Sequence, residues 1–136
     1  MFLVYQPEGQ DEPTRWRYNP RKLMSVERED LERRTGKNFT EFTTAVLQGN
    51  SLCRRALLFT FLRRDHAKTR FEDVDFAWDE LTLEYSRQEL ERMRERMPER
   101  LHGDELAAAL VQIDEEIEGA FDDVEESGKA SLPIAD

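Results

Sequence analysis

The feature that most constrains the fold is a stretch near the middle of the chain that is apolar on nearly every side. The seven residues 56–62 contain a single polar side chain, that of Thr60. A surface helix keeps a broad polar face, and this segment has little room for one. We therefore expect a helix from about residue 51 to about residue 64 at the centre of the fold, with Leu58 and Phe61 among the most buried residues.

Capping residues and helical spacing predict four further helices. The first is expected to start with Ser25 as its cap and to end at Gly36. The others are expected over about 38–49, over 86–98 and from near Asp104 to Phe121, and the first two of these open with capping-box sequences. The expected fold class is all-α, with a single compact helical domain of about five helices over residues 1–121.

Three segments lack a helical pattern. Residues 1–20 contain three prolines and a glycine and are expected to be irregular, with Trp16 and Tyr18 in an extended stretch that docks on the core. Residues 70–85 predict a loop with one helical turn capped by an aspartate, and a strand is the less favoured interpretation. Residues 122–136 are mostly acids and small residues, with one proline and no apolar periodicity, and predict a disordered tail.

The net charge of −10 is unevenly distributed. Residues 14–70 carry 14 basic and 6 acidic side chains, and residues 71–136 carry 6 basic and 21 acidic ones. The acidic part either covers the basic part of the same molecule or pairs with the basic part of another copy. Because the acidic part would repel phosphate, we expect no nucleic-acid partner for the whole chain.

Catalytic and metal-binding patterns are not found in the sequence. His66 and His102 have no other His or Cys at a metal-ligand spacing, and Cys53 lies in the most apolar helix, where it is expected to be a small buried hydrophobe. We therefore expect no enzyme activity, no metal and no cofactor. The single cysteine fits a reducing compartment, and the sequence predicts neither a signal peptide nor a membrane span.

Four segments together carry a resemblance to a known family. They read Thr-Gly-Lys-Asn-Phe-Thr-Glu-Phe at 35–42, Gly-Asn-Ser at 49–51, Arg-Ala-Leu-Leu-Phe-Thr-Phe-Leu-Arg-Arg at 55–64 and Arg-Phe-Glu-Asp-Val-Asp-Phe at 70–76. In this order and spacing they resemble the tail assembly chaperones of long-tailed, siphovirus-type bacteriophages, especially those of actinobacterial hosts. The resemblance covers about residues 16–85.

The resemblance implies a non-enzymatic function. Chaperones of this family coat the tape measure protein, a very long apolar helix that sets tail length, until tail tube subunits displace them. It implies that this chain forms a homo-oligomer in the host cytoplasm, has no membrane partner and is not retained in the mature virion.

A stripe of large apolar side chains in the last predicted helix is the candidate surface for self-association or for binding a partner. It consists of Leu106, Leu110, Ile113, Ile117 and Phe121, spaced at four, three, four and four residues. One interpretation packs the stripe on the body of the same molecule. The other docks it on a neighbouring copy or on a client helix.

The family resemblance also implies that the gene is read in two ways. Chaperones of this type are often made in a second, longer form by a programmed frameshift, and the longer form is thought to recruit the tail tube protein. Ser127, Gly128 and Lys129 can be encoded by a slippery heptanucleotide, although a tripeptide of this kind also suits a flexible linker.

Two other functions remain open. The acids at 114–126 can imitate the spacing of phosphates, so the chain could be an acidic nucleic-acid mimic that inhibits a host defence protein. It could also be a small helical regulatory protein that binds a partner helix. A mimic should bind with a strong dependence on salt, and a chaperone for an apolar helix with a weaker one.

Overall fold

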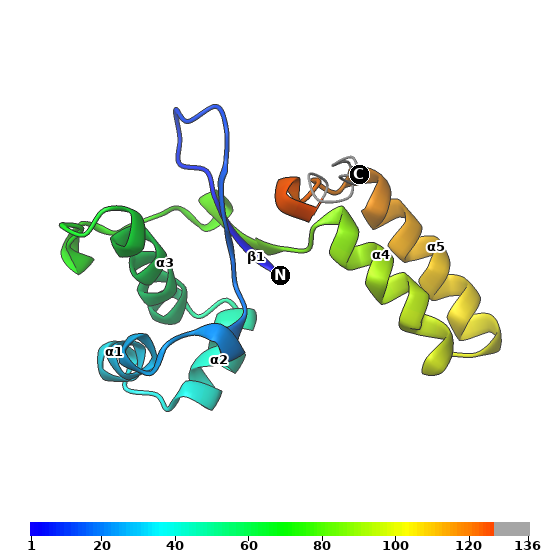
Figure 1. Ribbon diagram of the computed structural model, residues 1–136, viewed down its shortest axis with the longest axis horizontal. Coiled ribbons are helices and arrows are strands. Elements are labelled where there is room, and N and C mark those ends of the chain that lie inside the picture. Colours follow the sequence, from blue (N-terminus) through cyan, green and yellow to red (C-terminus); the bar gives the residue numbers. More distant parts are fainter. Residues whose placement is uncertain (127–136) are drawn as a thin grey trace, which may run out of the picture. The chain divides into compact units, whose positions relative to one another are not determined.

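The computed structural model describes residues 1–126, which fall into two units (Figure 1). Residues 2–83 form the N-terminal unit. The residues from Glu84 onward, together with Met1, form the C-terminal unit. The sequence predicted one helical domain over residues 1–121, whereas the buried side chains belong to two separate sets of elements.

A three-stranded sheet opens the N-terminal unit. Strand β1 (Phe2–Tyr5) pairs antiparallel with β2 (Thr14–Arg17), and β3 (Leu81–Glu84) lies on the other side of β1. Because β1 is the central strand, its first three side chains are buried. The fold is therefore mostly helical and not all-α.

The expectation of an irregular segment at 1–20 is wrong for the two strands, because prolines exclude a helix but not a hairpin. The extended stretch expected at Trp16 is confirmed by β2. Pro7, Gly9 and Pro13 all lie in the connection between β1 and β2, where no paired N–H is lost. The strand at 81–84 confirms the less favoured interpretation for the end of the 70–85 segment. The helical turn just before it is capped at Ala77 and not by an aspartate.

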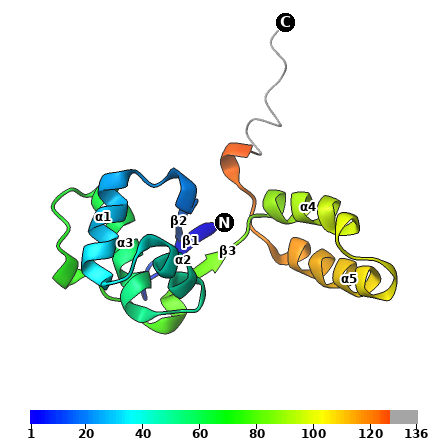
Figure 2. The same ribbon diagram turned by 90° about the horizontal axis from the view of Figure 1, so that it is seen from below.

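Three helices follow the hairpin and pack against one another (Figure 2), namely α1 (Ser25–Thr35), α2 (Phe39–Leu47) and α3 (Ser51–Asp65). Their bounds confirm the predicted ones within two residues. Asn38 and Asn50 cap α2 and α3 by accepting backbone N–H bonds of 2.8 and 3.0 Å. Ser25 is not a cap, since Met24 occupies that position without a side-chain bond. Single 3-10 turns occupy Pro20–Lys22, Phe71–Asp73 and Trp78–Glu80.

Helix α3 is the centre of the N-terminal unit, as predicted. Leu58 is fully buried and Phe61 is 1% exposed. Trp16 stacks on Phe61 with ring centroids 5.8 Å apart, and Tyr18 meets the same ring edge-on. The docking of the two N-terminal aromatics on the core is thereby confirmed.

The arginines at the ends of α1 and α3 lie against aromatic rings and carboxylates of the same unit. Arg34 lies 4.5 Å from the ring centroid of Phe59 and donates to Asp30 at 2.9 Å. Arg63 approaches both of these groups from α3, at 4.7 Å and 3.6 Å. These charges therefore join α1 to α3 and do not form a free basic surface.

The C-terminal unit is a helical hairpin of α4 (Arg87–Arg96) and α5 (Gly103–Gly119), joined through a 3-10 turn at Met97–Glu99. Both hydrogen bonds of the capping box predicted at 86–89 are present: the Ser86 hydroxyl accepts from the Glu89 backbone N–H, and the Glu89 carboxylate accepts from the Ser86 backbone N–H. Arg87 supplies the cation that α5 lacks in its last turn. Its guanidinium donates to the carbonyls of Ile117 and Ala120 at 3.1 and 3.0 Å, which satisfies the orphan carbonyls at the helix end.

The segment after α5 is not disordered over its first five residues, which corrects that part of the predicted tail at 122–136. Asp122 pairs with Arg87 at 3.2 Å, and the backbone of Asp123 donates to Gln88 at 2.8 Å. Residues 124–126 form a helical turn. The remainder of the predicted tail, 127–136, lies outside the described residues.

Replacing Leu58 by Ala is expected to lower the free energy of unfolding of the N-terminal unit by about 2–5 kcal/mol, because a fully buried side chain leaves a cavity. Both tryptophans belong to this unit, so denaturation followed by tryptophan fluorescence reports on it alone. Val26→Ala is the control, since Val26 is 69% exposed and its loss should change stability by at most about 0.5 kcal/mol. Equal stability of the two variants would contradict the position of α3 in the core.

The N-terminal unit is expected to lose stability between pH 10 and pH 12. Burial raises the pKa of Tyr18 to about 12 from 10.0, with a smaller contribution from Cys53. The neutral phenol therefore stabilises the fold fully below pH 10, and that contribution is lost as pH rises toward 12. At about 1.4 kcal/mol per unit, the loss is up to about 3 kcal/mol. Urea denaturation at pH 9 and pH 11.5 measures it, and Tyr18→Phe should remove this part of the pH dependence.

Candidate interaction surfaces

The residues that carry reactive groups do not form a shared site. Cys53 is buried, and burial raises the pKa of its thiol. His66 is exposed directly after the end of α3, and His102 is exposed directly before the start of α5. Within residues 1–126, no group of three or more His, Cys, Asp or Glu side chains is arranged to hold a metal ion. The surfaces that remain to be considered are apolar and charged ones.

The apolar stripe of α5 lies mostly within the hairpin. Ile113 is buried, while Leu106, Leu110, Ile117 and Phe121 are half-buried. Helices α4 and α5 pack together, and Leu90 is the buried residue of α4. This geometry agrees with the interpretation in which the stripe packs on the same molecule, and it leaves the other faces of both helices open.

An exposed apolar surface surrounds the turn between α2 and α3, and we call it the Trp78 surface. It consists of Leu47, Gly49, Leu52 and Trp78. Trp78 is 68% exposed and Leu47 is 58% exposed. The indole lies directly over the α-carbon of Gly49, because a Cβ built there would come within 2.7 Å of its Cη2 atom. Large exposed apolar side chains that gather at one place are typical of a binding surface.

The position of Trp78 is fixed from two sides. Arg54 donates to the carbonyl of Val46 at 2.9 Å, and its guanidinium lies 5.4 Å from the centroid of the Trp78 ring. Gly49 supports the ring from the turn, with a φ of +86° that favours glycine. The indole is therefore both exposed and held in place, so little conformational freedom remains to be lost when a partner covers it.

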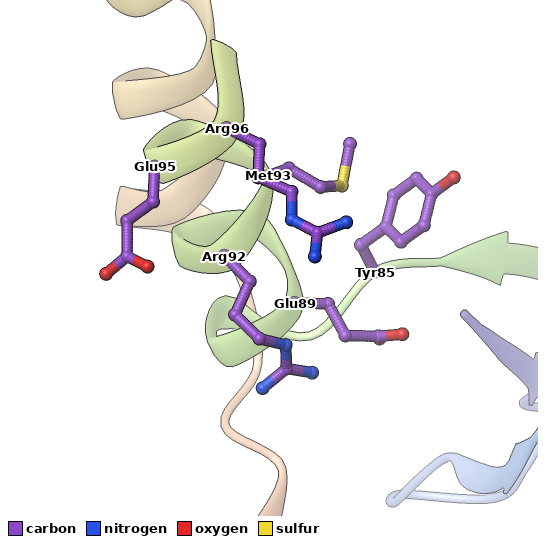
Figure 3. A pocket seen from close by; sticks show the side chains of 6 residues that line it. All are labelled: Tyr85, Glu89, Arg92, Met93, Glu95 and Arg96. Carbon is purple, nitrogen blue, oxygen red and sulfur yellow. The ribbon is translucent and has the colours of Figure 1, made fainter. Parts of the chain in front are cut away.

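A groove runs along one face of α4 and past its end, and we call it the α4 groove. It is formed by two adjoining hollows of about 500 and 440 Å³ that share Met93 and Arg96. Tyr85 lines the first, and Met97 and Leu101 line the second. Figure 3 shows Met93 and Arg96 extending from α4 toward the ring of Tyr85, whereas Glu95 points the other way. The groove thus combines flexible methionines with side chains of both charges, since Glu89 and Glu95 line the first hollow and Glu99 lines the second beside the arginines.

The charge asymmetry predicted from the two parts of the sequence changes when it is counted by unit. Residues 2–83 contain 14 basic and 14 acidic side chains, and residues 84–136 contain 6 basic and 16 acidic ones. The acids at 8–12 and at 72–80 therefore balance the basic segment inside the N-terminal unit. The whole excess of −10 belongs to the C-terminal unit, where α5 has six acids and no base.

Several of these acids are held by arginines of the same hairpin. Arg94 pairs with Asp114 at 2.7 Å, and this hydrogen bond lowers the pKa of the Asp114 carboxyl. Arg92 pairs with Glu126 at 2.7 Å. The row of acids at 114–126 is thus interrupted by cations, which a sequence count alone does not reveal.

Sequence reasoning missed both surfaces. In the sequence, Leu90, Met93 and Met97 follow one another at helical spacing, and that spacing does not separate a buried side of the helix from an exposed one. Trp78 stands among acidic residues in the sequence, and this position does not show whether its ring is exposed. The sequence signal available for it was the Gly-Asn-Ser segment at 49–51, which marks a tight turn but not the ring above it.

The remaining observations bear on the chain as a whole. Ser127, Gly128 and Lys129 lie outside the described residues. Within residues 1–126, no helix combines the length and the apolar content needed to cross a bilayer. Comparisons of the chain with protein-family models, with curated proteins and with solved structures gave no match.

Gly49→Ala is expected to displace the indole of Trp78, since the added methyl would collide with the ring. The measurement is the emission of Trp78 in a Trp16→Phe background, which should change in wavelength or in quenching by iodide. Gly36→Ala is the matched control, because Gly36 also has a positive φ of +70° but no atom within 4 Å of the added Cβ. If both substitutions change the emission equally, the contact between Gly49 and Trp78 is not the cause.

Proposed function

We propose that this chain is a non-enzymatic phage tail assembly chaperone that coats the tape measure protein and keeps it from aggregating until the tail tube assembles. The observation that carries the proposal is the Trp78 surface. Its turn contains the Gly-Asn-Ser segment at 49–51, one of the four segments on which the resemblance rests, and all four belong to the N-terminal unit. The resemblance and the exposed apolar side chains therefore coincide in one unit.

The chemistry of this surface suits an apolar helix. A helical client presents large side chains at every third or fourth position, and such side chains pack against tryptophan and leucine in the manner of a helix laid on an apolar surface. Trp78 is already held by Gly49 and Arg54, so a bound helix gains contact area at a small entropic cost. Preorganised aromatic side chains contribute strongly to binding free energy.

The setting of this function follows from the same proposal. The chain acts in the host cytoplasm in many copies and is absent from the mature virion. A longer product, made by a frameshift near Ser127, Gly128 and Lys129, connects the complex to the tail tube protein. The proposal assigns no catalytic step, metal or cofactor to any residue.

Co-expression with the tape measure protein tests the proposal. Trp78→Ser combined with Leu47→Ser should leave the chaperone folded, because both side chains are exposed, and should weaken client binding by at least about tenfold. Met24→Ser with Val26→Ser is the control, since these residues are 71% and 69% exposed but lie at the start of α1. The fraction of tape measure protein that stays in the supernatant is measured. Undiminished recovery with the first variant would contradict the proposal.

A nucleic-acid mimic is the second candidate, favoured by the six acids and no base of α5. It is weakened by the ion pairs of Asp114, Asp122 and Glu126 with arginines of the hairpin, which break the series of free negative charges. Salt separates the two functions. Binding to an apolar helix should change little between 0.1 and 1 M salt, whereas a mimic should release its basic target as the Debye length falls from about 10 to about 3 Å.

A further inference from the structure

The α4 groove carries charges of both signs around an apolar floor. Glu95 and Arg96 line its first hollow, and Glu99 and Arg100 line its second. None of these four side chains takes part in an ion pair within residues 1–126. The groove therefore favours neither an acidic nor a basic partner, and apolar character is what selects its occupant.

Large apolar side chains form the floor of this groove. Tyr85 is 40% exposed and Met93 is 39% exposed, and Met97 and Leu101 continue the floor past the end of α4. Figure 3 shows Met93 extending toward the Tyr85 ring. Because thioether side chains adapt their shape to what covers them, an uncharged segment with two or three apolar side chains suits this floor.

The described part of the chain stops beside the same groove. Asp123 is bound to α4 through Gln88, since its backbone N–H donates to the Gln88 side chain at 2.8 Å. Glu126, the last described residue, is half-buried, and its carboxylate pairs at 2.7 Å with Arg92, which lines the first hollow. The chain that follows Glu126 therefore starts next to the groove.

Apolar side chains follow Glu126 at a suitable distance along the chain. The sequence at 127–136 is Ser-Gly-Lys-Ala-Ser-Leu-Pro-Ile-Ala-Asp, and its section Ala-Ser-Leu-Pro-Ile-Ala carries no charge. Six residue steps lead from Glu126 to Leu132, and they can span up to about 20 Å. Arg92 and Met97 are separated by about 8 Å along the axis of α4. The chain is therefore long enough to bring Leu132 onto the floor of the groove.

We propose that Leu132, Pro133 and Ile134 dock in the α4 groove of their own molecule, with Leu132 and Ile134 covering Met93 and the Tyr85 ring. Pro133 restricts its own backbone and that of the preceding residue, which reduces the entropy lost on docking. An occupant joined to its site by a short tether has an effective concentration of about 1 mM, so it outcompetes a dilute separate protein. The inference concerns the C-terminal unit alone and does not rest on the proposed function.

Methionine methyl groups labelled with carbon-13 report on the groove in the full chain. The sequence contains four methionines, of which Met93 and Met97 line the groove and Met24 belongs to the N-terminal unit. Met24 is therefore the internal reference. The substitutions Met93→Leu and Met97→Leu identify the two groove signals in the spectrum.

Two variants separate the apolar triplet from the rest of the segment. The first carries Leu132→Ser and Ile134→Ser, which removes both large apolar side chains. The control carries Ala130→Ser and Ala135→Ser, which places the same number of serines in the same segment and keeps the triplet. All four positions lie outside the helices and strands described above, so both variants should fold as the wild type does, which circular dichroism checks.

The first variant should shift the Met93 and Met97 methyl signals and leave the Met24 signal in place, whereas the control should match the wild type. The wild-type signals should keep their positions on dilution, because docking within one molecule does not depend on concentration. Groove signals that the first variant leaves unchanged would overturn the proposal, as would equal shifts in the control. Wild-type signals that move toward those of the first variant on dilution would assign the groove to a second copy and would also overturn it.

Discussion

The N-terminal unit depends on covering α3 from every side. A helix with so little polar surface is stable in a small protein only when other elements bury it. The four arginines near its ends make this harder, because the elements that cover α3 must also accommodate their charges. The solution is to place guanidinium groups over aromatic rings. Arg34 and Arg63 both contact Phe59, and both approach Asp30. Each such stack contributes about 0.5–2 kcal/mol while keeping part of the charge solvated. The basic residues of this segment therefore act chiefly as packing residues.

The constraint on the C-terminal unit is an excess of negative charge, part of which lies at the C-terminal end of α5. Three of the six acids of α5 lie in or next to its last turn, where the helix dipole disfavours them. Arg87 relieves this by donating to two terminal carbonyls and pairing with Asp122. One arginine thereby closes the hairpin and also orders the segment that follows it.

What the sequence predicted well was local. The caps at Asn38, Asn50 and Ser86 are formed within four residues, so the sequence contains both partners of each bond. The strands at 2–5 and 14–17 depend on each other across a loop of eight residues, and no periodicity in four residues reveals that. The order at 122–126 likewise depends on Arg87, Gln88 and Arg92, some 34 residues away. Neither candidate surface was predicted from the sequence, and the reason is the same for both. Whether an apolar side chain is exposed depends on how elements distant in the sequence pack around it.

Counting charge by structural unit changes which association is physically reasonable. A basic segment facing an acidic one suggested that the two parts of the chain attract each other, within or between molecules. The N-terminal unit is neutral in sum, and several of its arginines are already stacked or paired, so it offers little to attract an acidic surface. The excess negative charge lies on the C-terminal unit, where α5 carries six acids and no base. Any electrostatic attraction that the chain exerts on a basic partner therefore originates from this hairpin and not from the basic segment at 14–70.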